Sequence, residues 1–377
     1  MHSGAVHRVA GLSASLMVVL ALSLPANLIA ATTASAPQRA RSTRPPVTQT
    51  TAPTEKKTTV KGTPKRAKRT YSASASRTRR ARLARARADA RAREAREVQT
   101  PRFRIDDLGQ EVPDVRAEAA IIYNPETNQV LWESNAQDQR SIASITKVMT
   151  ALVFVESGMP LTTPVSVVRS DVYRASTTYL RNGYQVSADD LMNLLLIGSD
   201  NAAARALARI SPYGAAGFIE RMNQRATDLG LMQTHYADPS GLLAANVSSA
   251  YDMARLIAFA ATDERIGAIM RKATHTVQAG KRTINVASTN HLVRSGEFDV
   301  LGGKTGFITS SGYCMASLLR LPQTGQQVAV VVLGAKSNQG RFWETRHLFN
   351  WMTSHAQKLL GIAPPPVPPT EGLALYE

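Results

Sequence analysis

The sequence predicts an α+β protein, in which an antiparallel sheet is built from the two ends of a globular segment. Strand-like runs occur early, at 119–123 and 129–133, and again late, at 303–308, 312–319 and 327–333. Helical patterns fill most of the interval between the two groups. Strands that are segregated from helices in this way indicate an α+β rather than an alternating βα arrangement. We therefore expect an antiparallel sheet flanked by helices, with a mostly helical subdomain inserted between its strands.

The early elements surround the first candidate functional residues. The runs at 119–123 and 129–133 are joined by Asn-Pro-Glu-Thr-Asn, a turn-rich connection typical of a hairpin. Ser141 resembles a helix N-cap. Apolar residues then recur with helical spacing at Ile145, Val148, Met149, Leu152 and Val155. The sequence thus predicts a buried helix directly after the first hairpin.

The later elements follow the same reasoning. Helical periodicity predicts helices at 188–197, 202–210 and 215–229, and another from a cap near Ser248 to about residue 261. A strand is expected at 274–278, in addition to the three late strands that begin at residue 303. The pattern of residues 342–360 predicts a final amphipathic helix. Residues 363–377 are rich in proline and are expected to be a disordered tail.

Charge divides the chain of 377 residues, whose formal net charge is +17. Residues 37–100 contain 19 Lys and Arg and only 4 Asp and Glu, whereas residues 101–377 contain 25 and 24. The first of these segments has almost no large apolar side chains, so it cannot offset the entropy of ordering. We expect residues 37–100 to be a disordered basic tether, with a transient helix over 81–98, and residues 101–362 to form the folded domain.

The N-terminal 36 residues resemble an export signal. Arg8 precedes an apolar run at 12–24, Pro25 ends that run, and Ala34-Ser35-Ala36 fits a cleavage site. An uncleaved membrane anchor is the alternative, but about 13 apolar residues are short of the roughly 20 that a span needs. We therefore expect export to the periplasm. For an exported chain, we expect the basic tether to bind anionic envelope polymers or to be a linker with no specific partner. Binding to nucleic acid is not expected.

Ser144-Ile-Thr-Lys147 is the first of three short motifs. Residues three apart share one face of a helix, so the Ser144 hydroxyl and the Lys147 amine are expected side by side. A serine becomes a nucleophile when a neighbouring group takes its proton, and burial makes a lysine amine a suitable base. A Ser and a Lys at this spacing also occur by chance, so the motif alone is weak.

Ser199-Asp-Asn201 is the second motif, and it follows an apolar run that anchors it in the core. Ser199 is expected to pass a proton to a leaving amine, and Asn201 to hold a substrate amide. Gly198 is expected to allow the turn that exposes both. An ordinary capped turn between helices is the alternative interpretation of this motif. Ser288-Thr-Asn290 has the same Ser-x-Asn form, and we rank this rival string second.

Lys304-Thr-Gly306 is the third motif, and it opens a late strand. Lys304 would supply positive potential and Thr305 a hydrogen bond, while the small Gly306 lets a substrate backbone approach. The backbone N–H groups of Ser144 and Phe307 would form the oxyanion hole. Alone, the motif also fits an ordinary strand bounded by glycine, but one copy of each motif, in this order, indicates a serine acyl-transfer site.

At these motifs the chain resembles the serine D-Ala-D-Ala peptidases, the low-molecular-mass penicillin-binding proteins. The resemblance extends over about residues 112–360 and includes the string at 238–242. Strings at 289–293 and 311–314 are similar in particular to the D-alanyl-D-alanine endopeptidases of the penicillin-binding protein 7 type. It implies a β-lactamase/transpeptidase-like fold, Ser144 as the acylated nucleophile and Lys147 as its base. It also implies that Ser199, Asn201, Lys304 and Thr305 complete the site.

The resemblance implies a hydrolase that cuts D-Ala bonds of peptidoglycan stem peptides and is acylated by β-lactams. An endopeptidase acting on D-Ala–diaminoacid cross-links is favoured, and a D-Ala-D-Ala carboxypeptidase is the alternative. A class A-like β-lactamase would need a carboxylate to activate water, yet neither Glu220 nor the segment 235–241 fits well. A wall-binding protein with a dead site is the remaining alternative. No cofactor or metal site is expected, and the single cysteine, Cys314, is expected to be buried.

Overall fold

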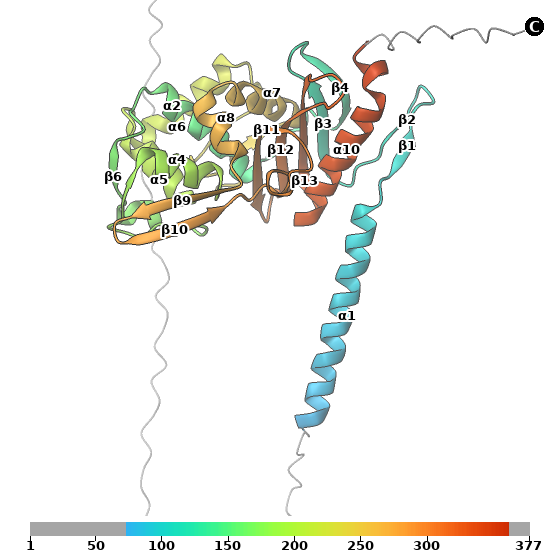
Figure 1. Ribbon diagram of the computed structural model, residues 1–377, viewed down its shortest axis with the longest axis horizontal. Coiled ribbons are helices and arrows are strands. Elements are labelled where there is room, and N and C mark those ends of the chain that lie inside the picture. The colour runs from blue at the N-terminus through green and yellow to red at the C-terminus, as the bar shows by residue number, and fades with distance from the viewer. Residues whose placement is uncertain (1–72, 362–377) are drawn as a thin grey trace, which may run out of the picture. The chain divides into compact units, whose positions relative to one another are not determined.

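The computed structural model describes residues 73–361 and centres on a five-stranded antiparallel sheet (Figure 1). The strand order is β11-β12-β13-β3-β4. The strands are β3 (Ala119–Asn124), β4 (Gln129–Ser134), β11 (Val300–Ile308), β12 (Gly312–Arg320) and β13 (Gln327–Ala335). Because β13 pairs with β3, the two ends of the globular segment form one sheet. The predicted α+β class is confirmed.

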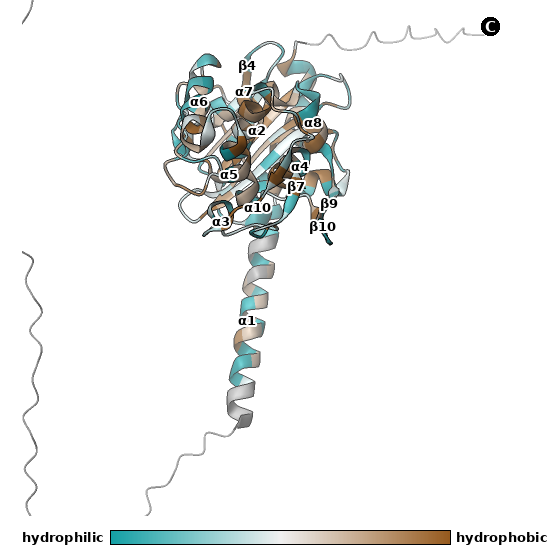
Figure 2. Cartoon of the chain, turned by 90° about the vertical axis from the view of Figure 1, so that its left-hand side faces the viewer, coloured by the Kyte–Doolittle hydropathy of each residue, from teal (hydrophilic) through white to brown (hydrophobic). Residues whose placement is uncertain are grey.

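Alternating side chains of the sheet build two apolar cores. Along β13, Val328, Val330 and Val332 pack with α10 (Asn338–Leu359) on one face, while Ala329 and Val331 pack with the inserted helices on the other. Successive strand residues point to opposite faces, so a sheet that is covered on both sides reads as a continuous apolar run. Figure 2 shows hydrophobic stretches, coloured brown, on inserted helices that face the viewer, such as α4 and α7. Cys314 lies in this sheet and is buried, as predicted.

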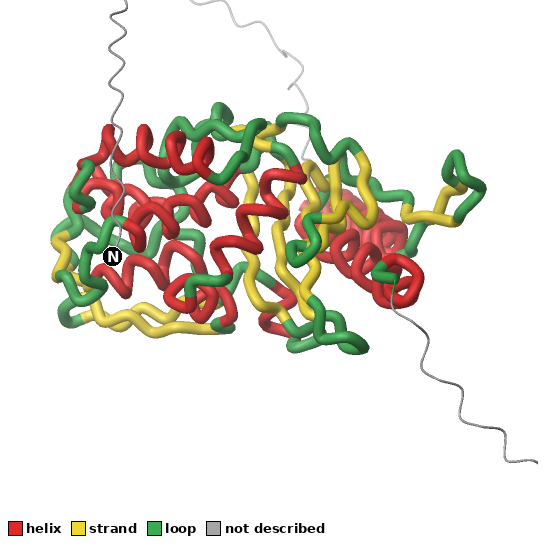
Figure 3. Tube along the Cα trace, turned by 90° about the horizontal axis from the view of Figure 1, so that it is seen from above, coloured by secondary structure: helices red, strands yellow, loops and turns green. Residues whose placement is uncertain are grey.

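The inserted region is mostly helical and gathers on one side of the sheet (Figure 3). Its main helices are α2 (Lys147–Glu156), α4 (Ala188–Leu196), α5 (Asn201–Ile210), α6 (Gly214–Asp228), α7 (Ala250–Ala261) and α8 (Glu264–Arg271). Helix α2 contacts the other five, and its residues from Lys147 to Val155 are all buried. Burying each large apolar side chain contributes about 1.5–3 kcal/mol. The helix that begins at Lys147 is therefore held firmly in the core.

Shorter elements complete the fold. They are β1 (Phe103–Ile105), β2 (Glu111–Pro113), β5 (Arg140–Ser141), the 3-10 helix η1 (Ala143–Thr146), β6 (Pro164–Ser166), α3 (Arg169–Val172), β7 (Gln185–Ser187), β8 (Val247–Ser248), β9 (Thr274–Ala279), β10 (Arg282–Ala287) and α9 (His291–Ser295). The strand expected at 274–278 is present as β9. It pairs with β10 in a separate ribbon and does not join the main sheet.

The interpretation of Ser141 as a helix N-cap is wrong. Ser141 lies in β5, which pairs with β8, and its buried hydroxyl has no hydrogen-bond partner among residues 73–361. The residue that precedes η1 is Ile142, which makes no side-chain cap. Strand pairing between distant segments therefore overrides the local capping preference of serine.

Helix α1 (Ala73–Gln99) occupies much of the segment expected to be disordered. It is longer than the transient helix expected over 81–98. Alanine and arginine are both strong helix formers, which explains a helix that is exposed over most of its length and contacts α10. Apart from Val98, the side chains described in α1 from Thr78 onward are exposed. The expected signal (1–36), the start of the tether and the tail (363–377) lie outside the described residues. Within 73–361, no helix is both long and apolar enough to cross a membrane.

Candidate active site

Ser144 and Lys147 lie together at the junction of η1 and α2. Ser144 is in the 3-10 turn and Lys147 is the first residue of α2. The prediction that both lie on one α-helix is therefore wrong. The tighter turn still brings their side chains together, and Lys147 Nζ donates to Ser144 Oγ at 2.9 Å. Ala143 has a positive φ of 47°, a strained backbone next to Ser144.

The Lys147 amine is fully buried and surrounded by neutral acceptors. It also donates to Asn201 Oδ1 at 2.6 Å and to the Ser240 carbonyl oxygen. Burial lowers the pKa of Lys147 to about 7, although the negative charges of Asp238 and Asp200 act in the opposite direction. A substantial fraction of Lys147 is therefore the neutral amine near pH 7, which is the form that can take a proton from Ser144.

The loop at 238–243 was not assigned a catalytic contact from the sequence, yet it completes the lysine environment. Asp238 Oδ1 accepts from the backbone N–H groups of Ser240 and Gly241, both at 2.6 Å. Gly241 has a φ of +77°, and a Cβ there would overlap the Ala143 carbonyl. The loop therefore presses against the nucleophile turn, and Asp238 fixes the carbonyl that faces Lys147.

Ser199 and Asn201 are placed by the turn between α4 and α5. The positive φ in this turn is at Ser199 (57°), not at the expected Gly198, which is instead packed tightly against Val286. Asp200 caps α5 through Ala203 N and also accepts from Tyr179 N at 2.6 Å. Burial raises the pKa of Asp200, and hydrogen bonds to its carboxylate oppose that rise.

Lys304, Thr305 and Gly306 lie on β11, which packs against η1 and its Ser144. Lys304 Nζ donates to Ser199 Oγ at 2.8 Å, which joins the second and third motifs. Burial, together with the positive charge of Lys147, lowers the pKa of Lys304 well below its usual value. A bound anion would raise that pKa again. A Cβ on Gly306 would lie 2.7 Å from the Ile142 carbonyl oxygen, so only glycine lets β11 approach η1 this closely.

Arg341, from the first turn of α10, is a site residue that the sequence did not reveal. It is 7% exposed, lines the cleft and donates to the Gly306 carbonyl oxygen at 2.9 Å. That carbonyl belongs to the same peptide unit as the Phe307 N–H. Burial lowers the pKa of Arg341 to about 10. Arg341 therefore orients and polarises a backbone donor expected in the oxyanion hole. Arg341 lies just before the helix expected at 342–360, so the sequence pattern did not indicate that it belongs to the site.

These groups line a cleft of about 400 Å³. Its lining includes Ser144, Ser199, Asn201, Thr305 and Phe307, with Lys147 and Lys304 buried beneath. Among the described residues that line the cleft there is no Asp or Glu. The arrangement suits attack of a serine on a carbonyl, with two lysines and a second serine to move the protons.

The other candidate residues lie apart from this chemistry. Ser288 accepts from Asn290 N, and Asn290 caps α9, so the rival Ser-x-Asn string is used to shape a turn. Only Thr289 of that string lines the cleft, and its hydroxyl accepts from Thr305 at 2.7 Å. Glu220 is exposed on α6, and Asp238 is occupied by its own loop.

Comparison with known families gives a direct match. A family model described as D-alanyl-D-alanine carboxypeptidase matches residues 107–337. D-alanyl-D-alanine endopeptidases of Haemophilus influenzae and Escherichia coli are 33% and 31% identical, covering 60% and 64% of this chain and 78% of each relative. The Escherichia coli D-alanyl-D-alanine carboxypeptidase DacD is 31% identical, and the match covers 63% of each chain.

Solved structures show the same fold. A DD-transpeptidase from Streptomyces matches with a TM-score of 0.60 and 26% identity, over 64% of this chain and 98% of that one. A penicillin-binding protein from Listeria monocytogenes, in its cefotaxime-bound form, matches with a TM-score of 0.57 and 28% identity over the same shares. The predicted β-lactamase/transpeptidase-like fold is therefore confirmed.

Proposed function

The chain belongs to the D-alanyl-D-alanine carboxypeptidase family of serine peptidases, and from that premise we propose that it is an endopeptidase that cuts peptidoglycan cross-links between D-Ala and the diaminoacid of the next stem. The observation that carries the chemistry is the 2.9 Å contact between Ser144 Oγ and the buried Lys147 amine. The endopeptidase preference is supported by the first relatives, which carry that name.

In the acylation step, Ser144 Oγ attacks the D-Ala carbonyl while neutral Lys147 takes the hydroxyl proton. The developing oxyanion is held by the N–H groups of Ser144 and Phe307. The bond between that carbonyl and the leaving amine then breaks. Ser199 gives its proton to the leaving amine and regains one from the protonated Lys147, directly or through Lys304, which restores the neutral Lys147 amine. Water then attacks the Ser144 ester and gives a proton to the site lysine. That proton returns to Ser144 Oγ as the ester bond breaks, which releases the stem peptide.

The same site is proposed to react with penicillin, whose strained amide would acylate Ser144. No carboxylate lines the described cleft to activate water, so the penicilloyl ester should be long-lived. This separates a peptidase from a class A-like β-lactamase. Rapid turnover of penicillin by the purified protein would contradict the proposal, and failure of labelled penicillin to bind would support a dead wall-binding protein.

Endopeptidase and carboxypeptidase reactions share every catalytic group, so the products must decide between them. The purified protein would be incubated with cross-linked dimeric muropeptides and, separately, with monomeric pentapeptides. Conversion of dimers to monomers is expected. Release of D-Ala from pentapeptides with dimers left intact would instead indicate the carboxypeptidase alternative.

Export to the periplasm is a further part of the proposal, and it rests on the signal-like sequence at 1–36. The expected result is a mature chain that begins after residue 30, 31 or 36, determined by N-terminal sequencing. A full-length chain recovered from the cytoplasm would contradict it.

The basic tether is proposed to hold the enzyme on anionic envelope polymers. Within it, α1 presents exposed arginines such as Arg79, Arg80 and Arg82 on a helix with few acids. Such attraction between exposed charges weakens with salt. Binding to isolated envelope should therefore be lost at high salt and on deletion of residues 37–100. Salt-independent binding would contradict the electrostatic explanation.

A further inference from the structure

A second hollow opens directly beyond the oxyanion end of the cleft. It has a volume of about 330 Å³ and shares Phe307 and Thr309 with the active-site cleft. Its other walls come from the β11–β12 turn, the end of β13 and two charged segments, at Glu118 and Arg140. The hollow therefore adjoins the active-site cleft at Phe307 and Thr309.

The direction of the reaction decides which part of a substrate reaches this hollow. The leaving amine must lie near Ser199, whose hydroxyl accepts from Lys304, at one end of the cleft. The carbonyl under attack lies between Ser144 and Phe307. The chain on the acyl side of that carbonyl must therefore continue past Phe307, along β11 toward Thr309, which is the rim of the second hollow.

The charged side chains that line the hollow have no ion-pair partner among the described residues. Arg140 and Lys336 both line it, and neither side chain makes a hydrogen bond or ion pair among the described residues. Lys336 is exposed and Arg140 is half-buried. Glu118 is the one carboxylate on its wall, and it too has no ion-pair partner in the described part of the chain. The hollow therefore carries a net positive charge.

The remaining wall is a firm apolar surface. The rings of Phe307 and Tyr313 are stacked with centroids 4.2 Å apart, and Phe307 is 48% exposed. A side chain could lie along these rings while its end meets the two cations. Flat apolar walls with a few convergent charges are typical of sites that recognise amphipathic groups.

We propose that the hollow formed by Arg140, Lys336, Phe307 and Tyr313 is an acyl-donor subsite that binds a carboxylate on the side chain of the stem-peptide residue that precedes the attacked D-Ala. The inference rests on the proposed function, because it takes the direction of the substrate from it. A carboxylate held by Arg140 gains charge-assisted hydrogen bonds, and Lys336 adds attraction without fixed geometry. Glu118 opposes the binding of any anion.

Two synthetic donors test the subsite without depending on the leaving group. Both are N-acyl-D-Ala thioesters, and they differ only in whether the side chain of the acyl residue ends in a carboxylate or in the primary amide. For the full chain, kcat/KM should favour the carboxylate donor roughly tenfold, the scale of one charge-assisted hydrogen bond. Arg140→Gln and Lys336→Gln should each lower that ratio, and together should bring it close to one. Glu118→Gln should raise it.

Lys281→Gln is the matched control, since Lys281 is an exposed cation on the β9–β10 turn and lines neither hollow. It should keep the full preference. Labelling with fluorescent penicillin reports whether each variant retains a folded site; if Arg140→Gln does not, the exposed Lys336→Gln variant carries the test. Equal kcat/KM for the two donors in the wild type, or a preference that survives both substitutions, would overturn the subsite. Hydrolysis of neither donor would instead overturn the proposed function.

Discussion

The lysine at position 147 determines most of the chemistry of the site. Its three hydrogen-bond acceptors, on Ser144, Asn201 and Ser240, are all uncharged. A direct carboxylate partner would keep the amine protonated, whereas burial with neutral acceptors favours the free base. Asp200 and Asp238 act only at longer range and limit the effect. The residue is thus poised between its two forms near neutral pH.

The pH dependence of acylation follows from this. The second-order rate constant for reaction of Ser144 with penicillin should rise with pH through about 7, as Lys147 loses its proton, and then level off. Lys147→Arg keeps a cation but cannot act as a base near neutrality, so its rate should fall by roughly 10²–10⁴. Stopped-flow measurement between pH 5 and 9 would check both. A rate that is constant across that range would show that Lys147 is not the base.

Asp238→Asn tests the pKa of the Lys147 amine by removing a nearby negative charge. The negative charge of Asp238 raises the pKa of Lys147, so its removal should move the midpoint of the pH profile below that of the wild type. The plateau rate should also fall, because Asn has only one acceptor oxygen and the Leu243 N–H, which donates to the second oxygen of Asp238, loses its acceptor in the loop that presents the Ser240 carbonyl. Asp263→Asn is the control: that carboxylate pairs with Arg265 and should leave the midpoint in place. A midpoint that rises in Asp238→Asn would contradict the account.

Some site residues could be predicted from the sequence and others could not, for a physical reason. Ser144, Lys147 and Lys304 lie in short strings whose spacing sets their local geometry. Ser240 acts through a backbone carbonyl, which any residue possesses. Arg341 reaches the Gly306 carbonyl only because α10 packs back on the sheet. Contacts that depend on tertiary packing leave no local pattern, which also explains why Ser141 was misinterpreted.

At the scale of elements, three segments must approach unusually closely to assemble the site. The nucleophile turn η1 lies between β11 and the loop at 238–243, and each approach is made at a glycine, Gly306 and Gly241. Helix α2 then fixes the turn, because it is buried against five other helices. The sequence predicted most of these elements, but not that η1 is a 3-10 turn or that β9 stands apart from the sheet.

Gly241→Ala tests the close approach, with Gly280→Ala as its matched control. Both glycines have positive φ, +77° and +62°, but a Cβ on Gly280 meets nothing within 4 Å while one on Gly241 overlaps the Ala143 carbonyl. Gly280→Ala should cost about 1 kcal/mol of unfolding free energy. Gly241→Ala should cost more, roughly 2–4 kcal/mol, and should slow penicillin acylation at least tenfold. Urea unfolding and acylation rates measure the two effects. Equal costs would show that φ alone matters.

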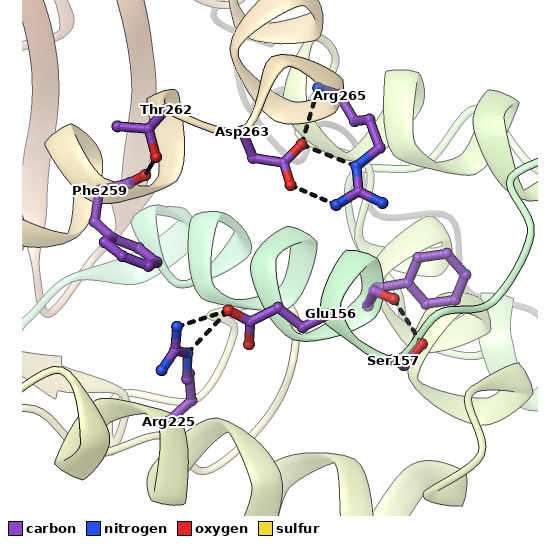
Figure 4. A network of polar contacts seen from close by, with 8 residues as sticks. Glu156, Ser157, Arg225, Phe259, Thr262, Asp263 and Arg265 are labelled. Carbon is purple, nitrogen blue, oxygen red and sulfur yellow. Dashed lines mark hydrogen bonds and ion pairs between the residues drawn. The ribbon is translucent and has the colours of Figure 1, made fainter.

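The far end of α2 is held by a different contact, shown in Figure 4. Glu156 is the last residue of α2, where a negative charge is unfavourable to the helix dipole. Arg225 of α6 donates to it through two nitrogens, at 3.0 and 2.7 Å, and its guanidinium lies over the Phe259 ring. The contact joins three helices on the side of α2 away from the nucleophile.

A double-mutant cycle of Glu156→Gln and Arg225→Gln measures that contact. The pair is partly exposed, with side-chain exposures of 28% and 19%, so the coupling free energy should be about 0.5–1 kcal/mol. Acylation of Ser144 should be unchanged, because neither residue touches the cleft. A coupling of zero would mean that the contact of Arg225 with the Phe259 ring, and not the ion pair, holds this end. A slowed acylation would show that the whole of α2 responds as one body.

Over the whole molecule, chemistry and charge are separated along the chain. All the residues placed in the cleft lie between Ser144 and Arg341. They belong to the segment 101–377, which is close to electrical neutrality with 25 Lys and Arg and 24 Asp and Glu, whereas the positive charge is concentrated at 37–100. The overall pI of about 10.3 therefore describes the tether and not the enzyme. Charge counts and periodicity were enough to predict this division and the sheet formed from both chain ends. They could not predict that α1 extends from Ala73 to Gln99.

The central claim is that Ser144 is the residue that is acylated. The purified full chain would be incubated with labelled penicillin, digested with trypsin and analysed by mass spectrometry. Cleavage after Arg140 and Lys147 releases Ser141-Ile-Ala-Ser-Ile-Thr-Lys147, which holds two serines, so fragmentation must locate the adduct. The account predicts a single adduct on Ser144, and none in Ser144→Ala. An adduct on Ser141, Ser199 or any other residue, or no adduct on the folded protein, would contradict it.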